Sequence, residues 1–536
     1  MFGQVMSELR KSIFPWIVAH FSLFLLPLLS LLIYFPSLHH DFISDDRPLV
    51  VENPYIKSWK YLPEMLSRDA WNISEPTNYW RPVFSISLAL DYSLWGLNPL
   101  GFHLTNILLH AINTVLLYLL GKRLQNSTSA GLFASLLFAL HPIQAHTVNV
   151  ISTRGDLLAA FFTLLSLQAF FSRKTIPFAI ALILALLSKE TSMVFPVAVL
   201  FAWIMIQREK QGLGVILGFV ILGLYLMVRL SLGFSFSLIP LVFSYDASWE
   251  TRWLLPFKVL ALYFVAIWNL FEIPHPFWTV ELPTSLNDPY VIGGILIAGL
   301  LVTALWFSFK KSPVATFGLA WFVIYFLPIS NFKELNQSMA EHWLYVPMIG
   351  LSLAFGAAFS ELYFRFAKVR PARAGFAAGV SVFLIFAVLV VREKTKIYQN
   401  DESFLIAAIR ANPDIVRLYT LLGNTYVKKQ EIPRAVELYT QALTLDPNDF
   451  QTNYYLGSVL YQVGEVDGAK IYLERIARTD PVLDGEVVPV AHAWEMLGDK
   501  RKALFYYRRA LELFPNSTGI KQNIATLENA VSADER

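Results

Sequence analysis

Long apolar segments separated by short polar stretches recur from residue 13 to residue 391. A helix that crosses a membrane needs about 20 mostly apolar residues, because each residue advances the helix by only ~1.5 Å. The twelve candidate spanning helices are residues 13–37, 103–121, 129–148, 155–172, 175–188, 192–207, 213–232, 254–272, 290–309, 313–330, 343–361 and 374–391. The stretch 81–97 is apolar but shorter, and we interpret it as a helix that lies at the membrane interface.

The composition agrees with a membrane protein of many spans. The chain has 536 residues, of which 55% are hydrophobic and only 15% charged, whereas soluble proteins carry about 25% charged residues. The net charge of +3 is too small to indicate a nucleic-acid partner. Because the chain has no cysteine, it has no disulfide, no thiolate metal site and no cysteine nucleophile. The first apolar run is too long for a signal-peptide core, and we expect it to be retained.

Basic clusters predict the orientation in the membrane, since cytoplasmic loops are enriched in Lys and Arg. These clusters are at residues 10–11, 122–123, 173–174, 208–210, 310–311 and 365–373. Placing them in the cytoplasm puts the loop 38–80 outside. Twelve crossings would return the C-terminus to the cytoplasm, yet the last cluster precedes residues 374–391 and places the C-terminal part of the chain outside. We therefore expect about eleven spanning helices, with 254–272 as the weakest candidate.

A different pattern begins near residue 398, where amphipathic sequence replaces the apolar segments. Small residues and prolines recur every 34 residues, which is the period of the tetratricopeptide repeat (TPR). The clearest series are Ala435, Ala469 and Ala503, and Pro447, Pro481 and Pro515. We expect a membrane domain at 1–396 and a TPR domain at 397–536. The latter has a half repeat at 398–415 and full repeats at 416–449, 450–483 and 484–517.

Two adjacent carboxylates come after the first spanning segment. Asp45 and Asp46 lie within a few residues of the predicted membrane surface, where an ionised side chain is costly. The pair could be an ordinary solvated loop in which Asp46 pairs with Arg47. Its position favours a function, and we interpret Asp45 as a catalytic base at the membrane interface.

Further polar residues stand at the ends of other segments. Arg81 suits phosphate because of its planar guanidinium, although Tyr, Trp and Arg are also ordinary interfacial anchors. Lys189 and Glu190 separate two apolar runs and form either a structural charge couple or part of a site. The other candidates at this predicted depth are His141, His146, Arg154, Glu341, His342 and Tyr345.

One predicted spanning helix carries a polar stripe. His103, Asn106, His110 and Asn113 are three or four residues apart and share a helical face. Such a stripe must face the bundle interior. Two histidines seven residues apart without an acidic partner are a weak metal signal. We therefore favour interhelical hydrogen bonds and assign no metal site.

The order of the motifs resembles one family. The Asp-Asp pair is followed by Trp-Arg-Pro, Gly-Phe-His-Leu-Thr-Asn, Leu-His-Pro, Arg-Gly-Asp, Ser-Lys-Glu, Leu-Tyr-Val-Pro and the TPRs. This set resembles the transmembrane-and-tetratricopeptide-repeat (TMTC-type) protein O-mannosyltransferases and their prokaryotic relatives, in the GT-C glycosyltransferase superfamily. The resemblance spans nearly the whole chain. One departure is His342, where the family pattern has Arg after Glu.

The resemblance implies an all-α fold, in which a GT-C-type bundle of membrane helices precedes the TPRs. It implies inverting transfer of mannose or another hexose from a polyprenyl-phosphate donor to a protein Ser or Thr hydroxyl outside the cytoplasm. Asp45 would be the base and Asp46 its support, with no certain cofactor. The implied donor-binding residues are Arg81, His141, His146, Arg154, Lys189, Glu190, Glu341, His342 and Tyr345. The implied acceptor-binding residues of the TPR concave face are Asn424, Tyr426, Asn453 and Tyr454.

Two other functions stay open. A non-catalytic scaffold would use the TPRs to recruit partners for envelope or pilus assembly, and a lipid-linked sugar transporter would move its substrate through the bundle. An enzyme requires Asp45, Arg81, Arg154 and Lys189 to converge, whereas a scaffold does not. A transporter would place ionisable groups along a path through the membrane midplane. In a prokaryote the expected location is the inner or plasma membrane.

Overall fold

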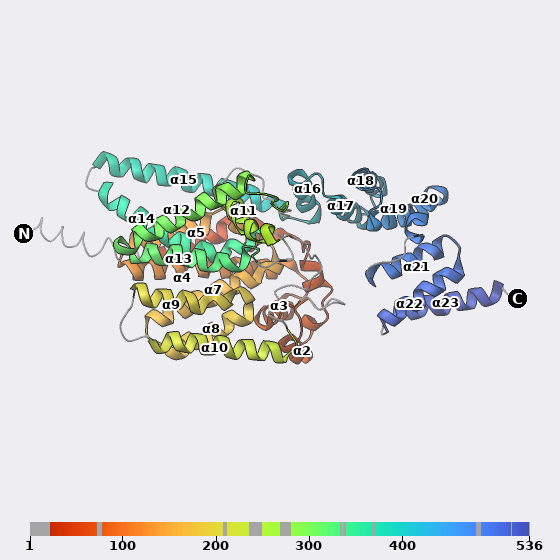
Figure 1. Cartoon of the computed structure of the whole chain (residues 1–536), viewed down its shortest axis with the longest axis horizontal. Helices are drawn as coiled ribbons and strands as arrows, with labels where there is room; N and C mark the ends of the chain where they lie inside the picture. The colour runs from red at the N-terminus through yellow and green to blue at the C-terminus, as the bar shows by residue number, and fades with distance from the viewer. Residues whose placement is uncertain are drawn as a thin grey trace, which may run out of the picture. The chain divides into compact units, whose positions relative to one another are not determined.

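Helices form every regular element of the residues that the computed structural model describes (Figure 1). These residues are 22–71, 78–206, 212–234, 249–268, 280–332, 335, 339–366, 370–478, 484–515 and 517–534. The chain divides after Phe404 into two compact units, which are described separately. The predicted all-α class is thus confirmed over the described part of the chain.

The first unit is a bundle in which most of the long helices run side by side along one direction (Figure 1). After helical residues 22–34, its α-helices are α2 (Leu62–Ser67), α3 (Pro82–Trp95), α4 (Pro99–Gln125), α5 (Thr128–Leu140), α6 (Gln144–Asn149), α7 (Arg154–Phe171), α8 (Thr175–Ser188), α9 (Phe195–Ile206), α10 (Gly212–Ser231), α11 (Trp249–Trp268), α12 (Pro289–Lys311), α13 (Pro313–Phe326), α14 (Tyr345–Phe366) and α15 (Arg370–Ile397). Short helical turns connect them: η1 (Phe35–His39), η2 (Arg47–Val51), η3 (Tyr55–Lys57), η4 (Trp59–Tyr61), η5 (Ile151–Thr153), η6 (Glu190–Val194), η7 (Leu327–Ile329) and η8 (Glu341–Leu344).

Eight helices among the described residues are long and apolar enough to cross a membrane. They are Ser22–His39, Pro99–Gln125, Ile151–Phe171, Gly212–Ser231, Thr251–Trp268, Pro289–Lys311, Glu341–Phe366 and Ala374–Ile397. Four further apolar helices are shorter: Thr128–Leu140, Thr175–Ser188, Glu190–Ile206 and Pro313–Ile329. Each of the twelve predicted segments therefore contains a helix. The start of 13–37 and the ends of 192–207 and 254–272 lie outside the described residues.

The predicted span 129–148 is wrong in its extent, because it consists of two helices. α5 ends at Leu140, and His141 has an extended backbone with φ −69° and ψ 124°. Proline disfavours the helical conformation of the residue before it, so Pro142 ends the helix there. The chain then forms the short helix α6, all of whose residues are buried.

Close contact between backbones holds α13 and α14 together. Gly318 and Gly350 face each other, so that a Cβ on either would collide with the carbonyl oxygen of the other. Next to them, the indole N–H of Trp321 donates to the carbonyl of Val346 at 2.9 Å. Small residues are favoured where membrane helices pack, because they let the backbones approach.

The second unit is a series of antiparallel helix pairs with the TPR register. Its helices are α16 (Asp401–Ala411), in which the unit begins, α17 (Val416–Lys428), α18 (Ile432–Leu445), α19 (Phe450–Gln462), α20 (Val466–Ala477), η9 (Asp484–Glu486), α21 (Val487–Met496), α22 (Lys500–Leu513) and α23 (Thr518–Asp534). Ala435, Ala469 and Ala503 are fully buried. Gly423 lies directly against the ring of Tyr439, where a side chain would not fit. The 34-residue spacing therefore marks the positions where paired helices touch. Pro481, one of the prolines at this spacing, lies outside the described residues.

Gly350→Ala tests the contact between α13 and α14. We expect a loss of ~1–3 kcal/mol of stability, because the added methyl group must push two backbones apart. The measurement is the midpoint of thermal unfolding of the purified protein in detergent. The control is Gly299→Ala in α12, where a Cβ meets nothing within 4 Å. Equal midpoints for the two variants would contradict the predicted contact.

Candidate active site at one end of the helix bundle

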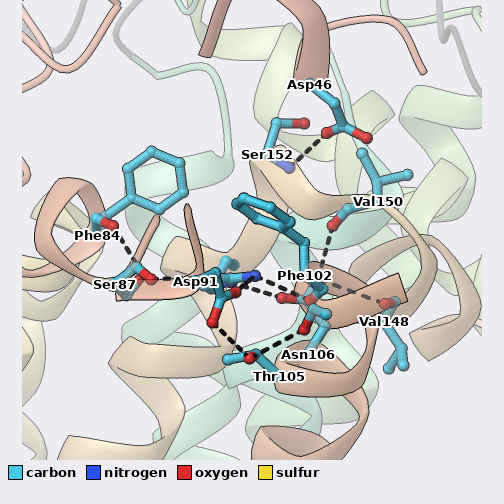
Figure 2. A network of polar contacts seen from close by, with 12 residues as sticks. Asp46, Phe84, Ser87, Asp91, Phe102, Thr105, Asn106, Val148, Val150 and Ser152 are labelled. Carbon is cyan, nitrogen blue, oxygen red and sulfur yellow. Dashed lines mark hydrogen bonds and ion pairs between the residues drawn. The ribbon is translucent and has the colours of Figure 1, made fainter. Parts of the chain in front are cut away.

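The two aspartates of the first loop lie in different environments. Asp45 is exposed, whereas Asp46 is fully buried. The Asp46 carboxylate accepts a hydrogen bond from the backbone N–H of Ser152 at 2.6 Å (Figure 2). It accepts a second one from the backbone N–H of Ile43 at 3.2 Å. One aspartate therefore anchors the loop to η5 at the start of α7, and the other is accessible.

The same loop is fixed to the segment after α15. The N–H of Asp41 donates to the carbonyl of Gln399 at 2.9 Å. The N–H of Ser44 donates to the carboxylate of Asp401 at 2.9 Å, and Arg47 pairs with that carboxylate at 2.8 Å. The solvated-loop interpretation expected Arg47 to pair with Asp46. In the structure Arg47 pairs with Asp401 instead. The first span and α15 consequently end at the same end of the bundle.

Burial also changes the acidity of the anchoring aspartate. It raises the pKa of Asp46 from 3.8 to about 7, and the charge of Asp45 adds to the rise. The hydrogen bonds from Ser152 and Ile43 partly offset this effect. Near neutral pH the Asp46 carboxyl group is therefore poised between its neutral and ionised forms.

Two buried ion pairs lie next to each other in the bundle. Arg81 donates from Nε to Glu190 at 2.9 Å and makes a second bond from Nη2 to the same carboxylate. Lys189 donates to both carboxylate oxygens of Asp156, at 2.7 and 2.6 Å. The consecutive residues Lys189 and Glu190 are thus not paired with each other, and each binds a partner from a distant segment. Breaking such a buried pair typically costs ~3–5 kcal/mol.

Arg154 has a different role from the one predicted. Its side chain is fully buried and lies 2.7 Å from the carboxylate of Asp91. Its nitrogens donate to Asn106 Oδ1 at 2.8 Å and to the carbonyls of Ser87 at 3.2 Å and Phe102 at 2.9 Å; Figure 2 shows these partners together. Because Nε and both terminal nitrogens are bound within the protein, Arg154 holds α3, α4 and α7 together. These internal bonds argue against the predicted donor-phosphate contact, which stays a prediction.

Three of the four residues in the polar stripe of α4 make hydrogen bonds to neighbouring segments, as predicted. The fourth, His103, is buried, and its ring nitrogens have no hydrogen-bond partner among the described residues. Asn106 donates to the carbonyl of Val150 at 3.0 Å. His110 and Asn113 both bind the hydroxyl of Tyr345, at 2.8 and 3.2 Å. Tyr345 is fully buried, so its hydroxyl joins α14 to α4. These contacts argue against a bond from Tyr345 to the donor, which stays a prediction.

Two predicted histidines meet near α6. The rings of His146 and His342 lie with centroids 4.9 Å apart. Burial lowers the pKa of His146 to about 4, and the charges of Lys189 and Lys394 lower it further. His146 is therefore neutral at pH 7 and lies within electrostatic range of both lysines.

The two remaining predicted residues lie near the end of α15. Glu341 is buried, and its carboxylate is 4.0 Å from the ammonium nitrogen of Lys394. His141 stands at the break after α5, where its Nδ1 accepts the N–H of Ile143 at 3.2 Å. Burial lowers the pKa of His141 to about 3, and the positive charge of Lys394 contributes.

The predicted acceptor-binding residues make contacts within the repeats. Asn424 accepts a hydrogen bond from Tyr439 at 2.6 Å, and the hydroxyl of Tyr454 lies 2.8 Å from an imidazole nitrogen of α21. Asn453 donates to two backbone carbonyls at 3.0 and 2.8 Å. Tyr426 and Asn453 are buried, which argues against a direct contact of these two with an acceptor.

Most of the predicted polar residues nevertheless converge. Burial raises the pKa of Tyr79 to about 12, and the carboxylates of Glu190 and Asp45 add to the rise. The guanidinium of Arg81 lies 4.4 Å from the centre of the Tyr79 ring. Asp45 is therefore within electrostatic range of Tyr79, whose ring lies next to Arg81. Among the described residues no cluster of three or more His, Asp or Glu is placed to hold a metal ion.

Sequence patterns did not single out Asp91 or Lys394, and they gave Asp156 only as part of the Arg-Gly-Asp motif. A carboxylate inside an apolar helix was a usable signal for Asp91 and Asp156, because such a group needs a buried cation. Lys394 stands between the exposed residues Arg392 and Lys396. Its charge does not distinguish it from these two basic neighbours. Only helical periodicity separates it from them, since 391, 394, 395 and 398 share one face.

Comparison with known proteins gives matches over both units. A model described as "TPR repeat" matches residues 423–464, and one described as "Tetratricopeptide repeat" matches residues 492–517. A protein O-mannosyl-transferase of Caenorhabditis elegans is 27% identical over 490 residues, covering 86% of this chain and 63% of its own length. Tmtc1 of Drosophila melanogaster, also called a protein O-mannosyl-transferase, is 25% identical over 501 residues, covering 72% of this chain and 57% of its own.

This chain is a relative of the TMTC-type protein O-mannosyl-transferases. The resemblance predicted from the ordered motifs is thereby confirmed. Human TMTC3, another protein O-mannosyl-transferase, matches 79% of this chain at 22% identity and 51% of its own length. The chain thus spans between about half and two thirds of the length of these three relatives. ArnT from Cupriavidus metallidurans, solved bound to undecaprenyl phosphate, aligns over 86% of this chain and 81% of its own, at 14% identity and a TM-score of 0.39.

The pH dependence of stability tests the environment of Asp46. Because the folded-state pKa of about 7 lies above the usual 3.8, the folded protein binds this proton more tightly than the unfolded chain. The stabilisation is complete below pH 4 and is lost as the pH rises to 7, by up to ~1.4 kcal/mol per pH unit. Asp46→Asn cannot ionise, so its unfolding midpoint should fall less than that of the wild type between pH 5 and pH 7. If the unfolding midpoints of the two proteins change equally with pH, the pKa of Asp46 is not raised.

Proposed function

We propose that this protein transfers a sugar from a polyprenyl-phosphate donor to a hydroxyl group of a protein on the extracytoplasmic side of a membrane. The observation that carries the proposal is the similarity to a protein O-mannosyl-transferase over 490 residues and 86% of the chain. The convergence of accessible and buried charges at one end of the bundle supports it. Mannose or another hexose is the sugar, and transfer is inverting.

Asp45 acts as the base in this proposal. A Ser or Thr hydroxyl is a weak nucleophile, and a positioned carboxylate accepts its proton as the oxygen attacks the anomeric carbon. Asp45 is exposed, so an acceptor can reach it. Asp46 supports it by anchoring the loop through the N–H groups of Ser152 and Ile43.

Arg81 and Lys189 stabilise the leaving phosphate. The two bonds of Arg81 to Glu190 use Nε and Nη2, and among the described residues Nη1 is left for an anion. Its side chain is 13% exposed, whereas that of Lys189 is 5% exposed and bound to Asp156. A planar guanidinium suits phosphate, and fixed positive charge in a water-poor site lowers the energy of the charge that develops there. Arg81 therefore makes the contact, and Lys189 acts through the field it adds.

The charge pattern sets the orientation. Arg123, in the basic cluster at the end of α4, donates to the carbonyl of Phe171 at 2.6 Å, so the clusters at 122–123 and 173–174 share one end of the bundle. The loop with Asp45 and the segment after α15 share the other, through the bond between Asp41 and Gln399. We place the first end in the cytoplasm and the second, with the TPRs that come after it, outside.

This arrangement favours an enzyme over the two other functions. A scaffold has no need for Asp45, Arg81 and Lys189 to come together. A transporter needs ionisable groups along a path across the membrane, but the polar stripe that runs along α4 is bound to neighbouring helices by its asparagines and His110. The TPR unit offers the surface that binds an extended protein acceptor.

Replacing the proposed base tests the reaction. Asp45→Asn should lower the turnover number by ~100- to 10,000-fold, because the acceptor hydroxyl loses its base. The measurement is transfer of labelled mannose from polyprenyl-phosphate mannose to a Ser/Thr-rich peptide by purified protein. Asp41→Asn, an exposed acid of the same loop, is the control and should keep full activity. Undiminished turnover in Asp45→Asn, with the folding of both variants intact, would refute the role of Asp45.

Single cysteines test the orientation, and the chain provides a clean background because it has none of its own. Lys60→Cys lies in the first loop and Lys174→Cys lies between α7 and α8, and both positions are exposed. In sealed right-side-out vesicles a membrane-impermeant maleimide should label only Lys60→Cys, and detergent should make both react. Labelling of Lys174→Cys in sealed vesicles would contradict the proposed orientation.

A further inference from the structure

The last two turns of α15 and the residues just after them present one buried face. Lys394 lies on this face although its neighbours in sequence are exposed. The residues of the face are Val391, Lys394, Thr395 and Tyr398, all of them buried. Their spacing of three and four residues is that of one side of a helix. An ammonium group is thus held inside the bundle, close to the end that carries Asp45.

Lys394 differs from the other buried cations of this region. Arg81, Arg154 and Lys189 each have a carboxylate oxygen within 2.9 Å. The ion pair of Lys394 is with Glu341 at 4.0 Å, which is beyond hydrogen-bond distance. An ammonium group carries three donors, and within the described part of the chain this one is not saturated by its carboxylate.

Polar atoms around this ion pair lack partners as well. Glu341 Oε2, His146 Nδ1, His342 Nδ1 and the hydroxyl of Tyr398 are buried and have no hydrogen-bond partner among the described residues. The ring of His146 lies with its centroid 4.9 Å from that of His342 and 5.4 Å from that of Tyr398. More than nine tenths of buried polar groups in proteins are paired. A cluster of unpaired ones therefore indicates a bound polar molecule.

The chemistry of the cluster identifies the class of that molecule. One ammonium and one carboxylate leave the cluster close to neutral, and the carboxylate of Glu341 repels a phosphate. Hydroxyl groups both donate and accept, so a sugar ring can donate to Glu341 and accept from Lys394. We propose that Lys394 and Glu341, with His146, His342 and Tyr398, bind the hydroxyl groups of the sugar that the donor carries. This inference rests on the proposed transfer reaction and adds a sugar subsite distinct from the phosphate contact at Arg81.

The test separates the sugar from its lipid phosphate. Lys394→Met and Glu341→Gln are compared with the wild type, using polyprenyl-phosphate mannose and polyprenyl-phosphate glucose as donors and polyprenyl phosphate as an inhibitor. Each variant should raise the donor KM by ~10- to 100-fold through the loss of a charged hydrogen bond, and should change the preference between the two hexoses. The inhibition constant of polyprenyl phosphate, which has no sugar, should stay within about twofold of the wild type.

The matched control is Lys396→Met, two residues away. Lys396 is exposed and pairs with Glu393 on the surface, so its replacement should change neither donor KM nor inhibition. Because Lys394→Met and Glu341→Gln alter opposite members of the ion pair, a folding defect in one does not remove the test. The unfolding midpoint of each variant shows whether it is folded.

Two results would overturn the inference and leave the transfer reaction intact. In the first, Lys394→Met weakens the binding of polyprenyl phosphate as much as it weakens the binding of the sugar donors. Lys394 would then be a phosphate contact. In the second, both variants keep the wild-type donor KM and hexose preference. Failure of the reaction itself is recognised separately, because the wild type would then transfer no sugar. In that case, binding of labelled sugar donors to the wild type and the variants tests the proposed sugar subsite. If the wild-type protein binds neither donor, the subsite is refuted.

Discussion

A charged side chain inside an apolar helix bundle needs an opposite charge or hydrogen-bond partners to offset its burial, and the structure of the first unit depends on this constraint. Transfer of an isolated charge from water into such surroundings costs several kcal/mol even after relaxation. Arg154, Lys189 and Arg81 each meet this requirement with a carboxylate from another segment, namely Asp91, Asp156 and Glu190. These pairs join separate segments of the chain, and so they fix the relative positions of α3, α7 and the break before α9.

The same constraint separates structural from chemical roles within a single loop. Asp45 and Asp46 are neighbours, but one is exposed and the other is enclosed by backbone N–H groups. The enclosed carboxylate keeps the loop against η5 and the start of α7. The exposed one can then meet a substrate from a fixed position. The base of the proposed reaction needs both accessibility and a rigid support, and Asp45 and Asp46 have these two properties.

The buried ion pairs of Arg81, Lys189 and Lys394 suit the chemistry proposed at a membrane surface. The lipid part of a polyprenyl donor requires apolar surroundings, whereas its phosphate and sugar require charges and hydrogen bonds. In the proposed reaction Arg81 with Lys189 supplies the charge, and the cluster of Lys394 and Glu341 supplies hydrogen-bonding groups. The proposal thus gives the neutral sugar ring and the anionic leaving group separate environments.

The helices, the repeat register and the interhelical use of the α4 stripe could be predicted from the sequence, because they depend on local periodicity and on the cost of burying polar groups. The sequence also pointed to the loop of Asp45 and to Lys189 with Glu190, since charge next to an apolar run is unusual. It could not show that Arg154 and Tyr345 are used inside the bundle, that Asp46 is buried while Asp45 is not, or that Lys394 faces inward. A side chain is free for chemistry only when no other segment satisfies it, and that depends on which distant parts of the chain the fold brings together.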